Sequence, residues 1–298
     1  MQSENNIPLV AIYMVTYNHE NYIAQAIDSV LMQQTNFSYK LFIGEDCSTD
    51  KTREICIKYA NKHPDKIELV LHETNVGATT NAQSIYKKCF ESGAKYVAML
   101  EGDDYWTDPL KLQKQVDFLE ANEEYIACFH KIRRIRDNKT IDYFPSFEND
   151  KVIYIDDLIN NWCLSIATLM FRQKALDNNF LKTGYHIGDK ILGFNLAKQG
   201  LLYYSNEVMT NYRFHDGGIT SNTSISWTDQ TLNYLIEFNK ENDNRYNSEI
   251  VKFIVNYYKT SQKGLSVYNK LRRLAYLSKV IFKMNPLLLF KNLNKLLF

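Results

Sequence analysis

Cysteine pairs, long apolar runs and the common nucleotide-loop fingerprints are all missing from this 298-residue sequence. The five cysteines form no CxxC pair, which excludes a disulfide framework and a zinc ribbon and favours a reducing compartment. Neither GxGxxG nor GxxxxGK[ST] occurs, so no dinucleotide fingerprint or P-loop is expected. No stretch approaches the roughly 18 apolar residues of a spanning helix. The opening MQSENNIPLV lacks the pattern of a signal peptide, and we expect a cytoplasmic protein.

Acidic side chains are absent from residues 261–298, which contain eight basic ones. The whole chain holds 35 basic and 34 acidic residues, so the remainder is net acidic, and the two parts should have different partners. Leucines and other apolar residues alternate with the basic ones in this tail, as in helices that lie in a membrane interface. We therefore expect peripheral binding to the inner face of the cell membrane. The alternative is a terminal helix that packs on its own domain and leaves its lysines in solvent.

The first third of the chain alternates short apolar runs with segments of helical periodicity. Strands are predicted at residues 9–16, 39–44, 67–71 and 95–100, and helices at 21–34, from Ser48 or Thr49 to Lys62, and at 75–92. Further on, helices are predicted at 108–122, 155–162 and 188–199, strands at 125–133, 167–171 and 201–214, and helices after Trp227. Such alternation indicates a mostly parallel sheet with right-handed crossovers.

Polar clusters follow three of the predicted strands directly: Thr16-Tyr17-Asn18, Glu45-Asp46 and Glu101-Gly102-Asp103-Asp104. Ligands of parallel sheets bind beyond the carboxyl ends of the strands, so these clusters mark the expected site. The third cluster offers oxygen ligands to Mg²⁺ or Mn²⁺, and Gly102 leaves room for close backbone approach. Because Mg²⁺ takes few protein carboxylates, the cluster indicates an open site for a metal bound to phosphates. The alternative is a solvated acidic loop.

Six segments, in this order and spacing, resemble the family 2 glycosyltransferases, which use nucleotide-activated sugars on a GT-A fold. They are VAIYMVTYNHENYIAQAIDSVLMQ (10–33), LFIGEDCSTDKT (41–52), NVGATTN (75–81), VAMLEGDDYWTDPLKLQKQVDFLE (97–120), HIGDKILGFNLAKQG (186–200) and YRFHDGGITS (212–221). Each motif alone is weak, but their joint order is specific. The resemblance implies an α/β GT-A domain at 1–225, with a nucleotide-sugar half (1–125) and an acceptor half (126–225). A helical region with the basic tail follows at 226–298.

The resemblance also implies roles for individual residues. Asp46 would accept a hydrogen bond from the base, commonly uracil, although Cys47 follows it where the family often has glycine. Asp103 would hold the metal and the diphosphate, while Glu101 would reach the ribose or a metal-bound water. Asp104 and Trp106 would face the donor sugar, unless Trp106 packs in the core. The remaining expected nucleotide contacts are Thr16, Tyr17, Asn18, Glu20, Asn75 and Gly77.

Asp189, in HIGDKI, matches the family aspartate that acts as general base, and the implied outcome is inversion at the anomeric carbon. His215 is a candidate metal ligand, and Arg213 would either pair with phosphate or hold the acidic site together. His186 lies near Asp189 in the sequence and would line the acceptor side. The other histidines, His19 among them, show no metal-ligand spacing and receive no role.

The expected reaction is sugar transfer from a nucleotide-sugar, with a UDP-sugar as the expected donor, to a glycan or lipid-linked hydroxyl acceptor in surface polysaccharide assembly. The expected cofactor is Mn²⁺ or Mg²⁺. A sugar nucleotidyltransferase is a rival, but residues 16–20 contain no basic residue except His19, whereas triphosphate loops carry Arg or Lys. A non-catalytic module that binds sugar nucleotides is a second rival. No QxxRW element occurs, which favours single additions over processive ones. Nucleic acid is not an expected partner, because the catalytic part is net acidic.

Overall fold

The computed structural model describes residues 7–177, 180, 184, 185, 187–218, 225–260, 266–289 and 292. These residues form two compact units, which we describe separately. The first unit comprises residues 1–154, 163–184 and 188–222, and the second comprises 155–162, 185–187 and 223–298. The boundary at 222 lies close to the expected one at 225, but two internal segments of the chain belong to the second unit.

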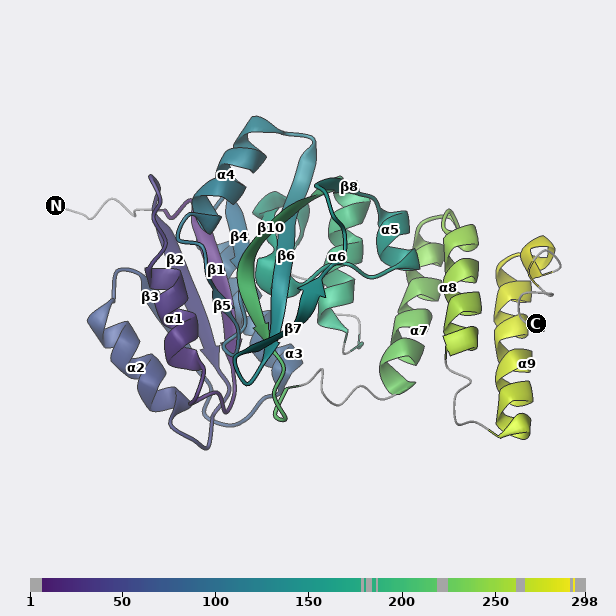
Figure 1. Ribbon diagram of the computed structural model, residues 1–298, viewed down its shortest axis with the longest axis horizontal. Helices are drawn as coiled ribbons and strands as arrows, with labels where there is room; N and C mark the ends of the chain where they lie inside the picture. The colour runs from purple at the N-terminus through teal and green to yellow at the C-terminus, as the bar shows by residue number, and fades with distance from the viewer. Residues whose placement is uncertain are drawn as a thin grey trace. The chain divides into compact units, whose positions relative to one another are not determined.

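The first unit is built on a ten-stranded mixed sheet (Figure 1). Its elements in chain order are β1 (Val10–Thr16), α1 (Ile23–Leu31), β2 (Tyr39–Glu45), α2 (Thr52–Lys62), β3 (Ile67–Leu71), α3 (Ala78–Glu91), β4 (Tyr96–Met99), β5 (Tyr105–Trp106), α4 (Lys111–Ala121), β6 (Tyr125–Arg136), β7 (Lys139–Phe144), β8 (Lys151–Ile153), β9 (Met170–Arg172), α6 (Gly188–Gln199) and β10 (Leu201–Arg213). Short 3-10 helices at Ile166–Thr168 and Gln173–Ala175 flank β9.

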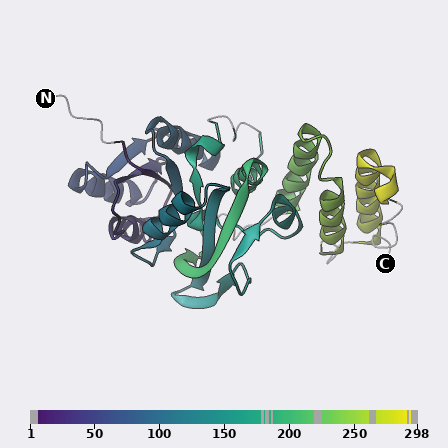
Figure 2. The ribbon, with the colours of Figure 1, turned by 90° about the horizontal axis from the view of Figure 1, so that it is seen from above.

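The strand order of the sheet is β3-β2-β1-β4-β9-β6-β10-β5. Strands β3, β2, β1 and β4 are parallel, and β6 and β10 form a second parallel pair that runs side by side in both views (Figure 1 and Figure 2). The short strand β9 is antiparallel to both β4 and β6 and joins the two parallel groups. The predicted mostly parallel α/β sheet is therefore confirmed.

Three strands were not predicted from the sequence. Strand β5 has two residues and pairs with β10, β7 returns antiparallel to β6, and β8 pairs with β10.

The predicted N-cap of the second helix, Ser48 or Thr49, is wrong. Helix α2 begins at Thr52, whose backbone N–H donates to Asp50 Oδ1 at 2.9 Å. An aspartate two residues upstream thus satisfies a donor that a hydroxyl was expected to satisfy.

Alternating side chains of β1 separate the two faces of the sheet. Val10, Ile12 and Met14 are fully buried in one core together with residues of α1, α2 and α4. Tyr13 points to the opposite face, where its ring meets Tyr86 of α3 at 4.6 Å between centroids. In Figure 1, α1 and α2 accordingly lie in front of the strands and α3 behind them. This packing holds the carboxyl ends of β1, β2 and β4 at one edge.

The second unit consists of helices α5 (Ile155–Asn160), α7 (Ile225–Glu241), α8 (Asn247–Thr260) and α9 (Val267–Met284). Helix α8 packs against α5, α7 and α9. Helix α9 is 18 residues long and presents Leu277 and Ile281 to the interior of the unit. Among the residues that the structure describes, no helix combines the length and the apolar character needed to cross a membrane.

Candidate functional site

The ends of β1, β2 and β4 converge because the three strands are neighbours in parallel register. Thr16, the last residue of β1, lies opposite Glu45, and its carbonyl accepts a hydrogen bond from the Asp46 backbone N–H at 3.1 Å. The Gly102 N–H donates to the Val15 carbonyl at 3.0 Å. The three clusters predicted from the sequence therefore meet at one edge of the sheet.

Three carboxylates gather at the end of β4. One oxygen each from Glu101, Asp103 and Asp104 lies within 4.8 Å of the others. Burial, together with the charges of Asp103 and Asp189, raises the pKa of Glu101 to about 8. Burial and the neighbouring carboxylates also raise the pKa of Asp104 well above its usual value. The three carboxylates repel one another, and a divalent cation would add positive charge that offsets this repulsion.

Asp104 is fully buried and is tied to β10. Its Oδ1 accepts the Arg213 backbone N–H at 2.8 Å, whereas its Oδ2 has no hydrogen-bond partner among the described residues. The Arg213 guanidinium donates to the Asp103 carbonyl and lies 4.3 Å from the centroid of the Tyr105 ring. Of the two expected roles for Arg213, the structure shows the one that holds the acidic loop together.

Asp103 lies between two histidines. His215 Nε2, just past the end of β10, is 3.1 Å from Asp103 Oδ2, and His19 Nε2 is 3.9 Å from the same oxygen. Burial alone would raise the pKa of Asp103, but the hydrogen bond from His215 and the nearby His19 lower it. Asp103 is thus held as a carboxylate, the form that binds cations. Asp103 and His215, each a candidate metal ligand from the sequence, therefore lie side by side, and His19 joins them.

Gly102 allows the acidic loop to approach β1. A Cβ atom at this position would lie 2.7 Å from Thr16 Oγ1, closer than such atoms pack, and 3.1 Å from His19 Nδ1, which is a tight contact. The donor set of carboxylates and imidazoles, the unpartnered oxygen of Asp104 and this close approach all fit a divalent cation bound to phosphate oxygens.

The expected nucleotide residues of the β1–α1 loop are tied to the loop that follows β2. The Asn18 side chain accepts from the Thr49 backbone N–H at 2.9 Å, and Glu20 Oε2 accepts from the Lys51 N–H at 3.0 Å. Asn18 has a φ of 54°, which asparagine tolerates better than most residues. Tyr17 is 41% exposed and presents its ring to solvent beside these loops. The two loops thus form one rigid wall of the site.

Asp46 is only 3% exposed, and its carboxylate is occupied by the loop before α3. Oδ1 accepts from the Val76 N–H at 2.7 Å, and Oδ2 accepts from the Gly77 N–H at 3.0 Å. Asn75 Nδ2 donates to the Asp46 carbonyl, and Gly77 has a φ of 85°, which favours glycine. The structure therefore brings Asp46, Asn75 and Gly77 together, with Asp46 as the anchor of the loop. A base could share only the remaining lone pairs of its carboxylate.

Asp189 lies in the first turn of α6 and close enough to Glu101 for its charge to raise the pKa of that carboxyl. Burial raises the pKa of Asp189 itself, and the neighbouring Lys190 opposes this effect. A carboxylate with raised pKa beside the acidic loop is suited to accept a proton. The acidic loop at residues 101–104 and Asp189, which are distant in the sequence, are thus close in space. His186 lies outside the described residues.

Trp106 does not reach the site. Its side chain is 1% exposed, Nε1 donates to the Ala167 carbonyl at 3.0 Å, and the Lys111 ammonium lies 4.0 Å from the ring centroid. The expectation that Trp106 stacks on a donor sugar is therefore corrected: both faces of the ring are covered by protein, and its role is core packing.

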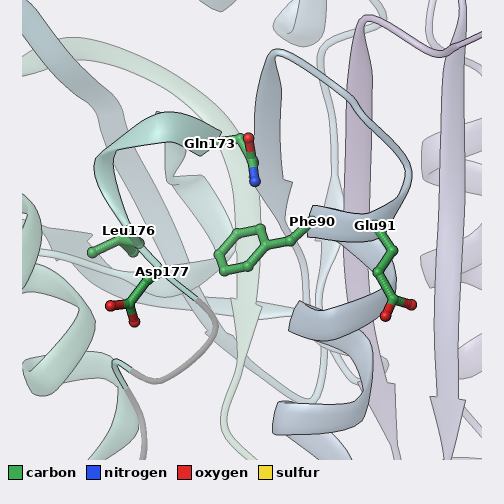
Figure 3. A pocket seen from close by; sticks show the side chains of 5 residues that line it. All are labelled: Phe90, Glu91, Gln173, Leu176 and Asp177. Atoms are coloured by element: carbon green, nitrogen blue, oxygen red, sulfur yellow. The ribbon is translucent and has the colours of Figure 1, made fainter.

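A pocket of about 240 Å³ lies elsewhere and carries no part of this site. Phe90 and Glu91, at the end of α3, and Gln173, Leu176 and Asp177, after β9, line it (Figure 3). Helix α3 leads into the start of β4, and Arg172 pairs with Tyr96 there. The pocket therefore lies at the amino end of β4, away from the carboxyl end at which the carboxylates gather.

Several residues that position other site residues were not predicted from the sequence. Arg53 forms an ion pair with the fully buried Glu45, and Thr52 Oγ1 accepts the His19 N–H at 2.8 Å. Gln25 accepts a hydrogen bond from the Arg213 guanidinium. None of these contacts leaves a local sequence signal, because Glu45 and Arg53 are eight residues apart and the other two contacts join segments that are distant in the chain. For His19, only its place in the loop after β1 was a usable sign.

Comparison with known proteins agrees with this geometry. Residues 11–180, more than half of the chain, match the family model described as glycosyl transferase family 2. An uncharacterised protein of Mycobacterium tuberculosis, Rv1520, is 32% identical over 211 residues, which are 70% of this chain and 60% of that protein. The chain thus spans less than two thirds of such mycobacterial relatives. TuaG of Bacillus subtilis, named as a teichuronic acid biosynthesis glycosyltransferase, is 28% identical over 72% of this chain and 82% of its own length.

Solved structures share the fold at low sequence identity. Residues 1–349 of Staphylococcus aureus TarS, in complex with UDP-GlcNAc, superpose with a TM-score of 0.71 at 16% identity, over 91% of this chain and 81% of that one. The mannosyltransferase PcManGT of Pyrobaculum calidifontis, in complex with GDP-Man and Mn²⁺, gives a TM-score of 0.50 at 14% identity, over 94% of this chain and 73% of that one. With its GT-A architecture, its acidic loop after β4 and the match over residues 11–180, the chain belongs to glycosyl transferase family 2.

Proposed function

We propose that this protein transfers a sugar from a nucleoside diphosphate sugar, with a UDP-sugar as the favoured donor, to a hydroxyl acceptor. The observation that carries the proposal is the joint presence of Asp103, flanked by His19 and His215, and of Asp189 near Glu101 at one strand edge. Transfer requires a group that stabilises the departing diphosphate and a base for the acceptor, and this edge offers candidates for both.

Asp103 and His215 are the residues that would hold the divalent cation. When bound, the cation would act as a Lewis acid on the diphosphate oxygens. Arg213 positions the acidic loop through the Asp103 carbonyl and Asp104, and Gly102 keeps the loop against Thr16. The loop with Asn75, Gly77 and Asp46 is the proposed contact of the base, together with residues 16–20.

Asp189 would take the proton of the acceptor hydroxyl. As the acceptor oxygen forms its bond to the anomeric carbon, the bond from that carbon to the diphosphate oxygen breaks, and the electron pair leaves with the nucleoside diphosphate. Attack from the side opposite to the leaving group inverts the anomeric carbon. The raised pKa of Asp189 brings it closer to the working pH, which favours a general base.

The acceptor is proposed to belong to a surface polysaccharide or its lipid-linked precursor. The name of TuaG, a teichuronic acid biosynthesis glycosyltransferase, supports this setting by similarity. Helix α9 supports it independently, since Arg272, Lys279 and Lys283 lie beside exposed apolar side chains on its outer face. Such a face suits the anionic surface of a membrane, where a lipid-linked acceptor is found.

Replacement of Asp189 by asparagine tests the proposal. We expect sugar transfer to fall about 10²–10⁴-fold, the usual contribution of a general base, while the Kd of UDP in the presence of Mn²⁺ stays unchanged. The control is Asp117→Asn on α4, where asparagine can keep the hydrogen bond from Gln113. Full transfer activity in Asp189→Asn would remove the base assignment. A wild-type chain that transfers no sugar from any donor while it binds UDP would favour the non-catalytic module.

A further inference from the structure

We infer that His19 is a third protein ligand of the divalent cation, so that His19 Nε2, Asp103 Oδ2 and His215 Nε2 bind a transition metal in preference to Mg²⁺. This inference rests on the proposed function for the presence of a cation, but its test does not depend on catalysis. The family resemblance assigns His19 nothing, and the sequence spacing gives no sign of the set.

The three ligand atoms already lie near a common centre. They are within 4.8 Å of one another, with His215 Nε2 at 3.1 Å and His19 Nε2 at 3.9 Å from Asp103 Oδ2. Two ligands at right angles, each about 2.1 Å from an ion, are about 3 Å apart. The His215–Asp103 pair has this separation. A small rotation of the His19 ring would bring its Nε2 to the same distance from Asp103 Oδ2.

The surroundings of His19 orient its ring toward Asp103. Its backbone N–H donates to Thr52 Oγ1 at 2.8 Å, and its Nδ1 lies 3.2 Å from Thr16 Oγ1. When Nε2 binds the cation, Nδ1 carries the proton and donates it to the Thr16 hydroxyl. Histidine ligands usually fix the unligated nitrogen with such a hydrogen bond. Gly102 adds to this arrangement, because any side chain there would displace both Thr16 and the ring.

Two imidazoles and one carboxylate differ in kind from the ligands of Mg²⁺. Mg²⁺ prefers oxygen and keeps several of its waters, whereas imidazole suits Zn²⁺, Co²⁺ and other transition metals, and Mn²⁺ accepts mixed sets. Three protein ligands also leave coordination positions for two diphosphate oxygens. The protein should therefore bind Mn²⁺ or Co²⁺ before any nucleotide arrives, which a site with a single carboxylate would do poorly.

The test is a titration of the full chain with Mn²⁺ in the absence of nucleotide, followed by the electron paramagnetic resonance signal of the free ion. Wild-type protein should bind one Mn²⁺, and His19→Ala should weaken the Kd at least 10-fold, as should His215→Ala. Co²⁺ should compete in the same concentration range, and Mg²⁺ only at far higher concentrations. His63→Gln, at the end of α2 and outside the cluster, is the matched control.

Unchanged Mn²⁺ affinity in His19→Ala, no binding to the wild-type chain without nucleotide, or equal competition by Mg²⁺ would each overturn the inference. Thermal unfolding of the metal-free variants, and the histidine-sensitive absorption spectrum of bound Co²⁺ in wild-type protein, separate lost ligation from lost folding. If His19 proves to be a ligand while no donor is turned over, the proposed function fails and the inference stands. If the protein transfers sugar but His19→Ala binds Mn²⁺ with unchanged affinity, the proposed function stands and the inference fails.

Discussion

Lys111 lies in the first turn of α4 and is fully buried. Lysine is almost never fully buried unless it has a partner. Its ammonium donates to Gln115 Oε1 at 2.7 Å and lies over the Trp106 ring. Burial lowers the pKa of Lys111 to about 7, and the nearby Cys128 opposes the effect weakly. Burial and Lys111 also lower the pKa of His130, which is completely buried. Folding thus lowers the pKa of two buried basic side chains, Lys111 and His130, and favours their neutral forms.

Lys111→Met tests this reading through the pH dependence of stability. Above pH 7 the unfolded chain keeps a proton on Lys111 up to about pH 10.5, whereas the folded chain has lost it. The unfolding free energy of the wild-type protein should therefore rise relative to Lys111→Met by about 1.4 kcal/mol per pH unit between pH 8 and 10. Below pH 7 the difference should be constant, because both states are protonated. Urea titrations at several pH values measure it.

Lys114→Met is the control for this series. Lys114 lies on the same helix, but ion pairs with Glu207 and Asp108 raise its pKa, so its charge is the same in both states between pH 8 and 10. The difference between this variant and the wild-type protein should be flat over that range. A flat difference for Lys111→Met as well would show that the buried amine is not deprotonated by folding.

Single residues also show where the sequence was insufficient. The convergence of the clusters at Thr16, Glu45 and Glu101 followed from the rule for parallel strand ends, whereas the roles of Asp103, His215 and Asp189 came from the family resemblance. Trp106 could not be placed, since its burial depends on Ala167 and Lys111, which approach it only in the folded chain. Asp46 was expected to face a base, but the backbone N–H groups of Val76 and Gly77 occupy its carboxylate. Side chains that bind backbone groups of distant loops leave no pattern in the sequence.

At the scale of elements, buried strands were easier to predict than exposed ones. Strands β1, β2 and β4 are almost entirely buried, so each appears as a continuous apolar run. Strand β7 is mostly exposed, and β5 and β8 have only two and three residues. Their pairing depends on the long partners β6 and β10 rather than on their own composition.

Helix α9 ends at Met284, shortly before Pro286, as expected because proline cannot continue a helix.

Helix α9 packs on one side and is bare on the other. Leu277 and Ile281 are buried, and Arg273 lies over the Tyr257 ring of α8 at 4.4 Å. The opposite side exposes Tyr268, Leu271, Tyr276 and Phe282, each more than half exposed. Part of the apolar surface of α9 thus belongs to the core of the second unit, as the alternative to membrane binding expects, and the exposed part is the surface that we propose for a membrane.

We expect the protein to sediment with vesicles that contain anionic phosphatidylglycerol and to stay in solution with neutral phosphatidylcholine vesicles. Leu271→Gln combined with Phe282→Gln should weaken binding about 10-fold or more, because each side chain would otherwise contribute burial worth about 1.5 kcal/mol or more. Added salt should weaken binding further, since basic residues near the surface contribute about 1 kcal/mol each. Tyr143→Gln, an exposed aromatic on β7, is the control. Equal binding of the double variant and the control would assign α9 another role.

The division of the molecule into two compact units was only partly predictable from the sequence. The resemblance to the family implied a boundary at residue 225, and the last segment of the first compact unit ends at 222. Helix α5 and residues 185–187 belong to the second unit although the chain around them belongs to the first. Leu158 and Ile159 of α5 are buried, and α5 packs on α8. Such a return of the chain is set by contacts and has no signature in composition.

The division into two units predicts that a chain that ends at residue 222 binds UDP as before but turns over more slowly. Every proposed nucleotide and metal residue lies in the first unit, so the Kd of UDP with Mn²⁺ should stay within about threefold, well under the 1.4 kcal/mol of a tenfold change. Asp189, however, comes two residues after Ile187, which is buried in the second unit, and Tyr185 contacts the Tyr234 ring of α7 at 5.7 Å. Without α7–α9, Tyr185 loses this contact within the second unit, so the segment that leads to Asp189 is no longer held, and kcat should fall about 10-fold or more, as with misplaced catalytic groups. Calorimetry and initial rates on both chains measure the two effects. Parallel losses of binding and kcat would mean that the second unit supports the whole site rather than the base alone.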